Sequence, residues 1–479
     1  MPYRAVVVGA GLAGMLAAAA LSAAVDEVVV VERDDLPDGP AHRRGVPQGR
    51  HAHLLMPGGL EAMEELIPGA GVRERLLEAG AHEVAFGSGM VAWTAQGWLR
   101  RWRDGGPRMV TCSRALLDWV VRDLVLERFP RVRIERGRAE GLAGSAARVT
   151  GVRIVPGTDD DGTAAERELA ADLVVEASGR GSRITAWLEE LGIGGVRERT
   201  IDVGLVNATR LYRTPEGAED FPLTVLQADP YGGRPGRSGM VLPIEGGRWM
   251  VSLAGTRGGG EPPADAESFL RYTLDLPHPI VGQLISGAEP LGEVHVSRST
   301  KNTRRYLERL RTWPEGLMVL GDAVATFNPA YGQGMSVAAI GAVELRRELE
   351  RGGPVAPGLA RRVQRRAARV VEAAWASAVG QDVFFPQVRG GRPNLADRLV
   401  SGYSRRLTGS AASSPGAARA LWDVTSMRTG PSRLLRPDAL LAALAGPLLP
   451  PLAGPPLTPA ERKILAELDG TGGGTGCLL

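Results

Sequence analysis

The chain has 479 residues, of which 44% are hydrophobic and 23% charged, and its net charge is +3 at pH 7. This length favours two or three domains with sizeable cores. The small net charge, without a block of basic residues, argues against a nucleic-acid-binding protein. Two cysteines, Cys112 and Cys477, are too few for a disulfide framework. We therefore expect a protein of the reducing cytoplasm.

The N-terminal segment predicts a dinucleotide-binding unit. Residues 5–8 and 28–31 are short β-branched runs typical of buried strands, and residues 15–24 favour a helix. Residues 9–14 between them read Gly-Ala-Gly-Leu-Ala-Gly, and Glu32 follows roughly 20 residues later. The glycines allow a tight turn and a close approach to a pyrophosphate, and Glu32 is placed to bind a ribose hydroxyl. A signal peptide or membrane anchor fits this glycine spacing poorly.

After this unit, the predicted secondary structure of the chain changes twice. Helices are expected at 60–79 and 113–129, and strands at 132–134, 149–155, 166–169 and 172–177. Between about 195 and 300, short strands alternate with Gly and Pro clusters, at 202–210, 223–227, 239–243, 249–254 and 294–299. A last buried strand at 317–320 precedes helices at 337–350 and 359–378. The apolar, proline-broken residues 440–450 predict a helix packed on the core rather than on a membrane surface, and they are too short to span one.

A second glycine cluster bears on the cofactor. Gly321-Asp322 ends the last strand, and residues 329–336 (PAYGQGMS) open the helix that follows. A glycine-rich helix start some 300 residues after the first motif would place another positive helix end at the same cofactor. A cofactor contacted at both ends by distant segments is long and buried, which favours FAD over a nicotinamide that must dissociate. A loop ended by a glycine cap is the simpler alternative.

These patterns predict an α/β protein with a Rossmann-like FAD-binding domain, an inserted and mostly antiparallel substrate-binding sheet, and a helical C-terminal region. The expected boundaries are 1–180 and 301–350 for the FAD-binding domain, with substrate-side segments near 85–110, then 181–300 for the inserted sheet and 351–479 for the helical region.

Several segments carry a family resemblance. Residues 9–14 with Glu32-Arg33, Cys112-Ser113-Arg114 before a helix, and Gly321-Asp322 with residues 329–335 are similar to the p-hydroxybenzoate hydroxylase and squalene epoxidase superfamily of FAD monooxygenases. More closely, RRGVPQGRHAH, CSRALLDW, EASGRGSR, GTRGGGEPPAD and FNPAYGQGMS resemble the epoxidases of polyether ionophore biosynthesis in actinomycetes, of the lasalocid and monensin type. The resemblance covers nearly the whole chain.

The resemblance implies roles for individual residues. The first glycine turn would line the pyrophosphate, Glu32 and Arg33 the adenosine, Arg114 the phosphates and ribityl chain, and Ala139 the adenine through its backbone. Asp322 would accept hydrogen bonds from the ribityl or phosphate region, and N–H groups of residues 332–335 would face the flavin pyrimidine edge. Arg43 is a weaker candidate near the mobile side of the flavin. The full set is Gly9, Gly11, Leu12, Ala13, Gly14, Glu32, Arg33, Arg43, Arg114, Ala139, Gly321, Asp322, Pro329, Gly332, Gln333, Gly334 and Met335.

The implied chemistry is the epoxidation of alkenes in a linear polyketide polyene by O₂ through a flavin C4a-hydroperoxide. The protein then positions the double bond and excludes water, so we expect no catalytic acid or base. A flavin hydroxylase of an aromatic polyketide and a flavin-dependent double-bond reductase are the alternatives. The halogenase signature W-x-W-x-I-P is absent, and neither lysine, Lys301 or Lys463, lies where a halogenase would need one.

One departure concerns the source of electrons. Ser178 stands where the family usually has an aspartate tied to FAD and NADPH contacts. Reduction by NAD(P)H directly and reduction through a separate flavin reductase both remain open.

Two other groups of residues have simpler interpretations. His51 and His53 have no nearby carboxylate or thiol pattern, so packing or a contact near the flavin is favoured and no metal site is expected. Trp93, Trp98 and Trp102 fit the core or a pocket wall. Contact of the apolar C-terminal region with a membrane surface is left open by the sequence.

Overall fold

A computed structural model describes residues 2–103, 105–157, 165–298 and 301–471, so Cys477 lies outside it. The first sheet has seven strands in the order β18-β10-β1-β2-β7-β8-β9. Five of them run parallel: β1 (Arg4–Val8), β2 (Glu27–Glu32), β7 (Val132–Gly144), β10 (Leu173–Glu176) and β18 (Leu317–Val319). Strands β1, β2, β10 and β18 are almost fully buried, which fits their apolar sequences, whereas β7 is largely exposed or half-buried.

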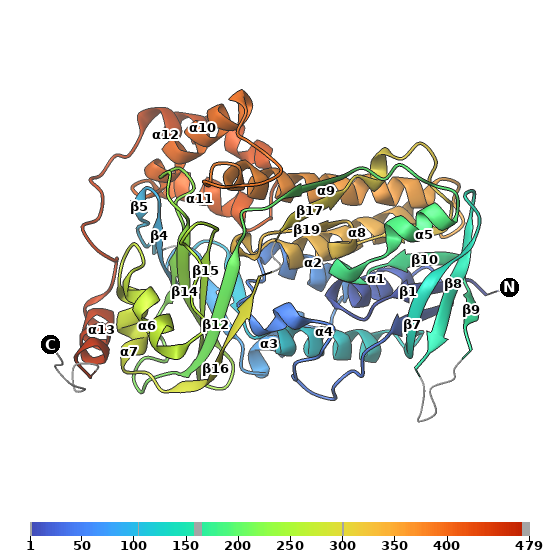
Figure 1. The fold of residues 1–479 in the computed structure, drawn as a ribbon, viewed down its shortest axis with the longest axis horizontal. Coiled ribbons are helices and arrows are strands. Elements are labelled where there is room, and N and C mark those ends of the chain that lie inside the picture. Colours follow the sequence, from blue (N-terminus) through green and yellow to red (C-terminus); the bar gives the residue numbers. More distant parts are fainter. Residues whose placement is uncertain (1, 104, 158–164, 299–300, 472–479) are drawn as a thin grey trace.

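An antiparallel extension widens this sheet. Strand β7 continues for 13 residues and pairs with β8 (Val149–Pro156), which pairs with β9 (Arg167–Ala170). Residues 158–164, between the strands expected at 149–155 and 166–169, lie outside the described residues. Helices α1 (Leu12–Ser22), α4 (Arg114–Arg128), α8 (Gly334–Gly352) and α9 (Leu359–Asp382) pack around the sheet, with α1 against both α4 and α8 (Figure 1).

A second seven-stranded sheet lies beside the first (Figure 1). Its order is β16-β12-β15-β14-β13-β4-β5, and all its pairs are antiparallel except β13 with β4. Five strands come from the inserted region: β12 (Val206–Arg213), β13 (Leu223–Leu226), β14 (Arg237–Ile244), β15 (Arg248–Gly255) and β16 (Pro290–Ser297). The other two, β4 (Met90–Thr94) and β5 (Gly97–Trp98), come from the segment near 85–110.

Two smaller sheets and several further helices complete the fold of the described residues. A three-stranded sheet contains β11 (Glu198–Ile201), β17 (Asn302–Arg305) and β19 (Ala325–Thr326), and a two-stranded one contains β3 (His82–Ala85) and β6 (Arg108–Thr111). Helix α5 (Ile184–Glu190) follows β10. Helices α10 (Leu395–Ala411), α11 (Pro415–Thr425) and α12 (Pro437–Ala445) form a cluster at one end, and α13 (Pro459–Thr471) contacts α7 (Figure 1).

The α/β architecture with a mostly antiparallel second sheet and C-terminal helices confirms the predicted fold class. Two local predictions were wrong. The helix expected at 60–79 is two helices, α2 (Pro57–Leu66) and α3 (Val72–Glu78), because residues 68–71 read Pro-Gly-Ala-Gly and break the helix. Helices α6 (Ala266–Leu274) and α7 (Ile280–Ser286) interrupt the region expected to be all strands. A helix does cover the first part of 440–450, as expected, but this helix, α12 (Pro437–Ala445), buries only Ala439 and Ala443.

Candidate functional site

The first glycine turn is a close-packed cradle. Gly9 has φ +99°, and a Cβ there would lie 2.9 Å from the carbonyl oxygen of Ala177 on the neighbouring strand. A Cβ at Gly14 would collide with the carbonyl oxygen of Gly9. Helix α1 then begins with Gly11 as its N-cap, and no described side chain caps it. The first N–H groups of α1 therefore stay available to an anion.

Glu32 ties this turn to the end of β2. One carboxylate oxygen accepts from Ala10 N at 2.8 Å and from Arg43 Nη1 at 3.0 Å, and the other accepts from Asp34 N at 3.1 Å. Arg43 also donates to the carbonyl of Ala10 at 3.2 Å. Arg43 was expected near the mobile side of the flavin, and its side chain is held against the first glycine turn by the buried carboxylate. Only the fold brings these two residues together.

The second motif contacts the first directly. Gly321 has φ +66°, and a Cβ there would lie 2.7 Å from Cβ of Ala13 in α1. Asp322 pairs with Arg180 at 3.3 Å, and its Oδ1 lies 3.8 Å from where a Gly334 side chain would begin. The N-terminal ends of α1 and α8 are thus joined through Gly321 and Asp322. This arrangement presents two positive helix ends and one carboxylate at the same edge of the first sheet.

The start of α8 contains polar atoms without partners. Residues Pro329–Tyr331 form a 3-10 turn, Gly332 ends it, and Gln333 is the N-cap of α8 without a side-chain hydrogen bond. Gln333 is 8% exposed, and its Oε1 and the Oγ of Ser336 are buried without a partner among the described residues. Buried polar atoms are normally paired. A bound cofactor that offers hydrogen-bond donors fits this end of the helix.

A buried aspartate holds this turn in place, and the sequence analysis did not find it. Asp382, at the end of α9, is 0% exposed and accepts from Tyr331 Oη at 2.6 Å, Asn302 Nδ2 at 2.6 Å and Asn328 Nδ2 at 3.1 Å. Asn328 N in turn donates to Asn302 Oδ1 at 2.7 Å. Burial raises the pKa of Asp382. Its partners lie 51 to 80 residues away along the chain, so no local pattern reveals them.

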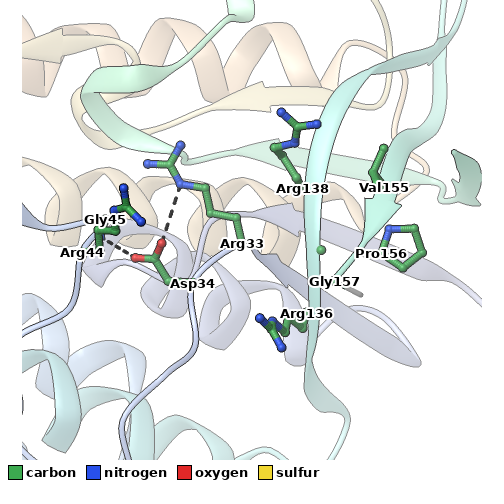
Figure 2. Close-up of a pocket in the computed structure, with 10 residues that line it drawn as sticks. Arg33, Asp34, Arg44, Gly45, Arg136, Arg138, Val155, Pro156 and Gly157 are labelled. Carbon is green, nitrogen blue, oxygen red and sulfur yellow. Dashed lines mark hydrogen bonds and ion pairs between the residues drawn. The ribbon is translucent and has the colours of Figure 1, made fainter. Parts of the chain in front are cut away.

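A pocket opens at the carboxyl end of β2, beside Glu32. Its volume is about 660 Å³, and Figure 2 shows arginines from three segments around it. Arg33 lines this pocket, and Ala139 follows Arg138 on β7, partly buried against the first core; their contacts with the adenosine stay predictions. The lining residues are Arg33, Asp34, Arg44, Gly45, Arg136, Gly137, Arg138, Val155, Pro156 and Gly157.

Arg114 lies at the start of α4, close to the Arg43 side chain. Ser113 caps the helix by accepting from Leu116 N, and Arg114 pairs with Asp118 one turn later at 2.7 Å. A small second pocket is lined by Arg43 and Arg114 together. The predicted contact of Arg114 with the FAD phosphates stays a prediction, as does that of Arg43.

The segment carrying His51 and His53 meets the second sheet. His51 Nδ1 lies 2.9 Å from Thr209 Oγ1 on β12, which lies 2.7 Å from Ser252 Oγ on β15. His53 Nδ1 lies 2.8 Å from the carbonyl oxygen of His51. Burial, aided by the charges of His295 and Arg180, lowers the pKa of His51 to about 4, and burial, aided by Arg114, lowers that of His53 to about 3. Both rings are therefore neutral at pH 7, as hydrogen-bonding groups between the two sheets.

Apolar residues continue this wall. A buried cluster between the second sheet and the N-terminal segment contains Val84, Met109, Leu223, Leu242, Ile244 and Met250, with Ala52, Leu54 and Leu211 packed against it. Trp93 and Trp98 belong to the core behind the second sheet, and Trp102 packs against the C-terminal helices. The wall that faces residues 51–54 is thus mainly aliphatic.

The departure at Ser178 also has a structural consequence. Ser178 Oγ and N both donate to Glu176, which is 0% exposed at the end of β10. Burial raises the pKa of Glu176 to about 7, against the lowering effect of the two serine hydroxyls at 178 and 182. The next arginine, Arg180, supplies the ion pair with Asp322. Arg180 therefore places a cation beside Asp322. The family pattern would add a carboxylate nearby, at position 178.

Comparison with known proteins identifies the class. Residues 3–369 match the family described as FAD binding domain, and the chain belongs to that family. FAD is therefore its cofactor. The glycine cradle, the two helix ends and the unpartnered atoms of α8 fit this assignment, and FAD would be held between the segments that carry Gly9–Gly14, Gly321–Asp322 and Gly332–Met335.

Individual relatives place the chain more closely. It is 34% identical to Protein Rv3254 of Mycobacterium tuberculosis (strain ATCC 25618 / H37Rv) over 400 residues, which is 80% of each chain. Its fold is similar to that of CmlS, a flavin-dependent halogenase, with a TM-score of 0.60 and 17% identity over 89% of this chain and 77% of that one. It is also similar to P. aeruginosa PqsL in complex with 2-aminobenzoylacetate, with a TM-score of 0.59 and 18% identity over 80% and 95% of the two chains. At these identities, the solved structures establish the fold.

Proposed function

We propose that the protein is an FAD-dependent monooxygenase that epoxidises an alkene of a linear polyketide. The observation that carries the proposal is the junction of both helix ends with Asp322, together with Leu54, which lies beside Gly332 and packs on the mainly aliphatic cluster of the second sheet. FAD supplies the activation of O₂ when it is bound. One oxygen atom goes to the alkene, the other leaves as water, and NAD(P)H supplies two electrons directly or through a flavin reductase.

The residues of this chain have three tasks in this proposal. The partly buried aliphatic side chains on this cluster, Ala52, Leu54 and Leu211, contact the hydrocarbon and exclude water from the reacting double bond. His51, Thr209 and Ser252 offer neutral hydrogen-bonding groups that orient polar parts of the substrate without adding a charge. The N-terminal ends of α1 and α8 stabilise negative charge on the cofactor. The resemblance to polyether epoxidases supports the choice of a polyene.

The test is product analysis with the purified flavoprotein under ¹⁸O₂. A linear polyene should gain one ¹⁸O atom per epoxide, and the matched saturated chain should not react. A hydroxylated phenol and an unreacted polyene would instead identify an aromatic hydroxylase. Saturation of the double bond without O₂ would identify a reductase. A halogenated product, formed only with bromide or chloride, would connect the activity to that of the halogenases that share the fold.

The electron supply is tested with Ser178→Asp. We expect this variant to change the rate of flavin reduction by NADPH, because it places a carboxylate near the Arg180–Asp322 pair, while leaving substrate binding unchanged. Stopped-flow absorbance of the flavin under anaerobic conditions measures the rate. Ser182→Asp is the matched control, since Ser182 also lies beside Glu176. An unchanged rate in Ser178→Asp would remove the reason to infer a separate reductase.

A further inference from the structure

Helix α12 turns its large apolar side chains away from the protein. Ala439 and Ala443 are 1% and 3% exposed, whereas Leu441 and Leu444 are 65% and 73% exposed. Surface helices normally direct their larger apolar side chains to the core. Of the thirteen large apolar side chains exposed in the described chain, six lie in this short stretch: Leu435, Leu440, Leu441, Leu444, Leu448 and Leu449.

Specific hydrogen bonds fix this orientation. Ser410 Oγ donates to the carbonyl of Ala442 at 2.7 Å, and Arg406 Nε donates to that of Ala443 at 3.2 Å. At the other end, Arg433 pairs with Asp438 at 2.9 Å and with Asp423 at 3.1 Å. Rotation of α12 to bury its leucines would break these contacts. The leucines are therefore presented to the outside by the way in which α12 is anchored on α10 and α11.

The charge around this face is strongly positive. Residues 389–449 contain nine arginines and three aspartates, with no lysine or glutamate, so this segment has a net charge of +6 in a chain whose total is +3. Arg436, directly before α12, and Arg398, beside exposed Leu399 on α10, are both exposed and form no ion pair with the described residues. Figure 1 shows α10 and α12 at the same end of the molecule.

We propose that α12 and residues 446–449 dock the protein on an anionic lipid bilayer. Exposed leucines enter the boundary between headgroups and acyl chains, and the arginines meet the lipid phosphates. A second copy of the chain fits less well, because it would bring two segments of net charge +6 together. No helix in the described ranges is long and apolar enough to cross a membrane, so the contact is peripheral.

The experiment is flotation of the full-length flavoprotein with vesicles of phosphatidylcholine alone or with one-third phosphatidylglycerol. We expect binding to the anionic vesicles that weakens as salt is raised. Leu441→Ser with Leu444→Ser should weaken it at least tenfold, since two buried leucines are lost. Leu126→Ser with Leu274→Ser is the matched control, because these leucines are 37% and 44% exposed elsewhere on the molecule. It should bind like the wild type.

Bound flavin and the melting temperature show whether each variant is folded. A separate variant, Arg398→Gln with Arg436→Gln, removes two positive charges. It should lose selectivity for anionic lipid while keeping its flavin. Absence of wild-type binding to anionic vesicles would overturn the proposal, as would equal binding by the Leu441→Ser, Leu444→Ser variant. Conversion of a dimer to a monomer by that variant, seen by light scattering, would assign the face to a second copy instead.

Discussion

Single residues at the junction of the two motifs serve the cofactor and the fold together. Asp322 accepts from Arg180 beside the start of α8, and Glu32 holds the first glycine turn to β2. Both carboxylates lie next to a helix N-terminus, where the helix dipole favours negative charge. Such groups are costly to remove, because their buried donors then lose a partner.

Asp322→Ala should weaken FAD binding by about 10-fold or more, the effect of losing one hydrogen bond to a charged acceptor, about 1.5–3 kcal/mol. Fluorescence titration of the deflavinated protein with FAD measures the dissociation constant. The control is Asp423→Ala, which removes a similarly exposed partner of an arginine, Arg433, in the C-terminal helices. If Asp322→Ala binds FAD like the wild type, Asp322 has no role at the cofactor.

Glu176 should make stability depend on pH. Its pKa is raised to about 7 by burial, against an ordinary value of 4.5. The folded state therefore holds a proton that the unfolded state loses between these two values, and the contribution of Glu176 to stability falls as pH rises from about 4.5 to 7. The change is about 3 kcal/mol at most.

Glu176→Gln removes this titration and retains an acceptor for Ser178. Its melting temperature relative to the wild type should therefore rise between pH 5 and pH 8. Comparing the two proteins at each pH cancels the opposite effect of His51 and His53, whose lowered pKa values remove stability as the pH falls below about 6.5. A difference that stays constant across this range would show that Glu176 does not titrate there.

Among the elements, helices α8 and α9 pack against each other, and a buried carboxylate binds several partners at each end of this pair. Asp382 secures the turn before α8, and Glu348, whose side chain is 4% exposed, binds Arg351, Arg362 and Arg366 at the far end. Only Asp382 lies next to the turn before α8, where we expect FAD to bind. We therefore expect both ends of the pair to contribute to the stability of the fold, and only the end near Asp382 to affect FAD binding.

Asp382→Ala leaves three buried donors without their acceptor and should lower both the melting temperature and the affinity for FAD, the latter about 10-fold or more. Glu348→Ala should lower the melting temperature alone. The circular dichroism of the bound flavin reports its surroundings, so it should change in Asp382→Ala and not in Glu348→Ala. Tyr331→Phe removes a single donor and should have a smaller effect. An equal loss of FAD affinity in Asp382→Ala and Glu348→Ala would refute this positioning role.

At the scale of the whole molecule, the segments that we expect to hold FAD are far apart in the chain. The first glycine turn, Gly321–Asp322 and the start of α8 belong to one core, which also contains α1, α4 and α9. Binding to the folded state alone stabilises it by mass action, by about 2.7 kcal/mol at a hundredfold excess over the dissociation constant. Deflavinated protein should therefore melt at a lower temperature, which rises with the logarithm of added FAD. NAD⁺ at the same concentrations is the control, and equal stabilisation by NAD⁺ would contradict the selectivity for FAD.

The amino-acid sequence by itself determined the class of fold and the cofactor, because both depend on local patterns. Buried parallel strands require β-branched runs, and the glycine positions follow from close backbone contacts such as that of Gly14 with Gly9. Ser113 before α4 likewise marks a helix start by a local hydrogen bond. These signals lie within a few residues of one another.

Only the tertiary structure decided which distant side chains meet. The pairing of Arg43 with Glu32, the contacts of Asp382 with Tyr331 and Asn302, and the contact of His51 with Thr209 depend on how strands and helices pack. The exposure of Leu441 and Leu444 is of the same kind, because an apolar helix gives no sign of which face its neighbours will cover. Long-range packing sets these relations, and no spacing along the chain encodes them.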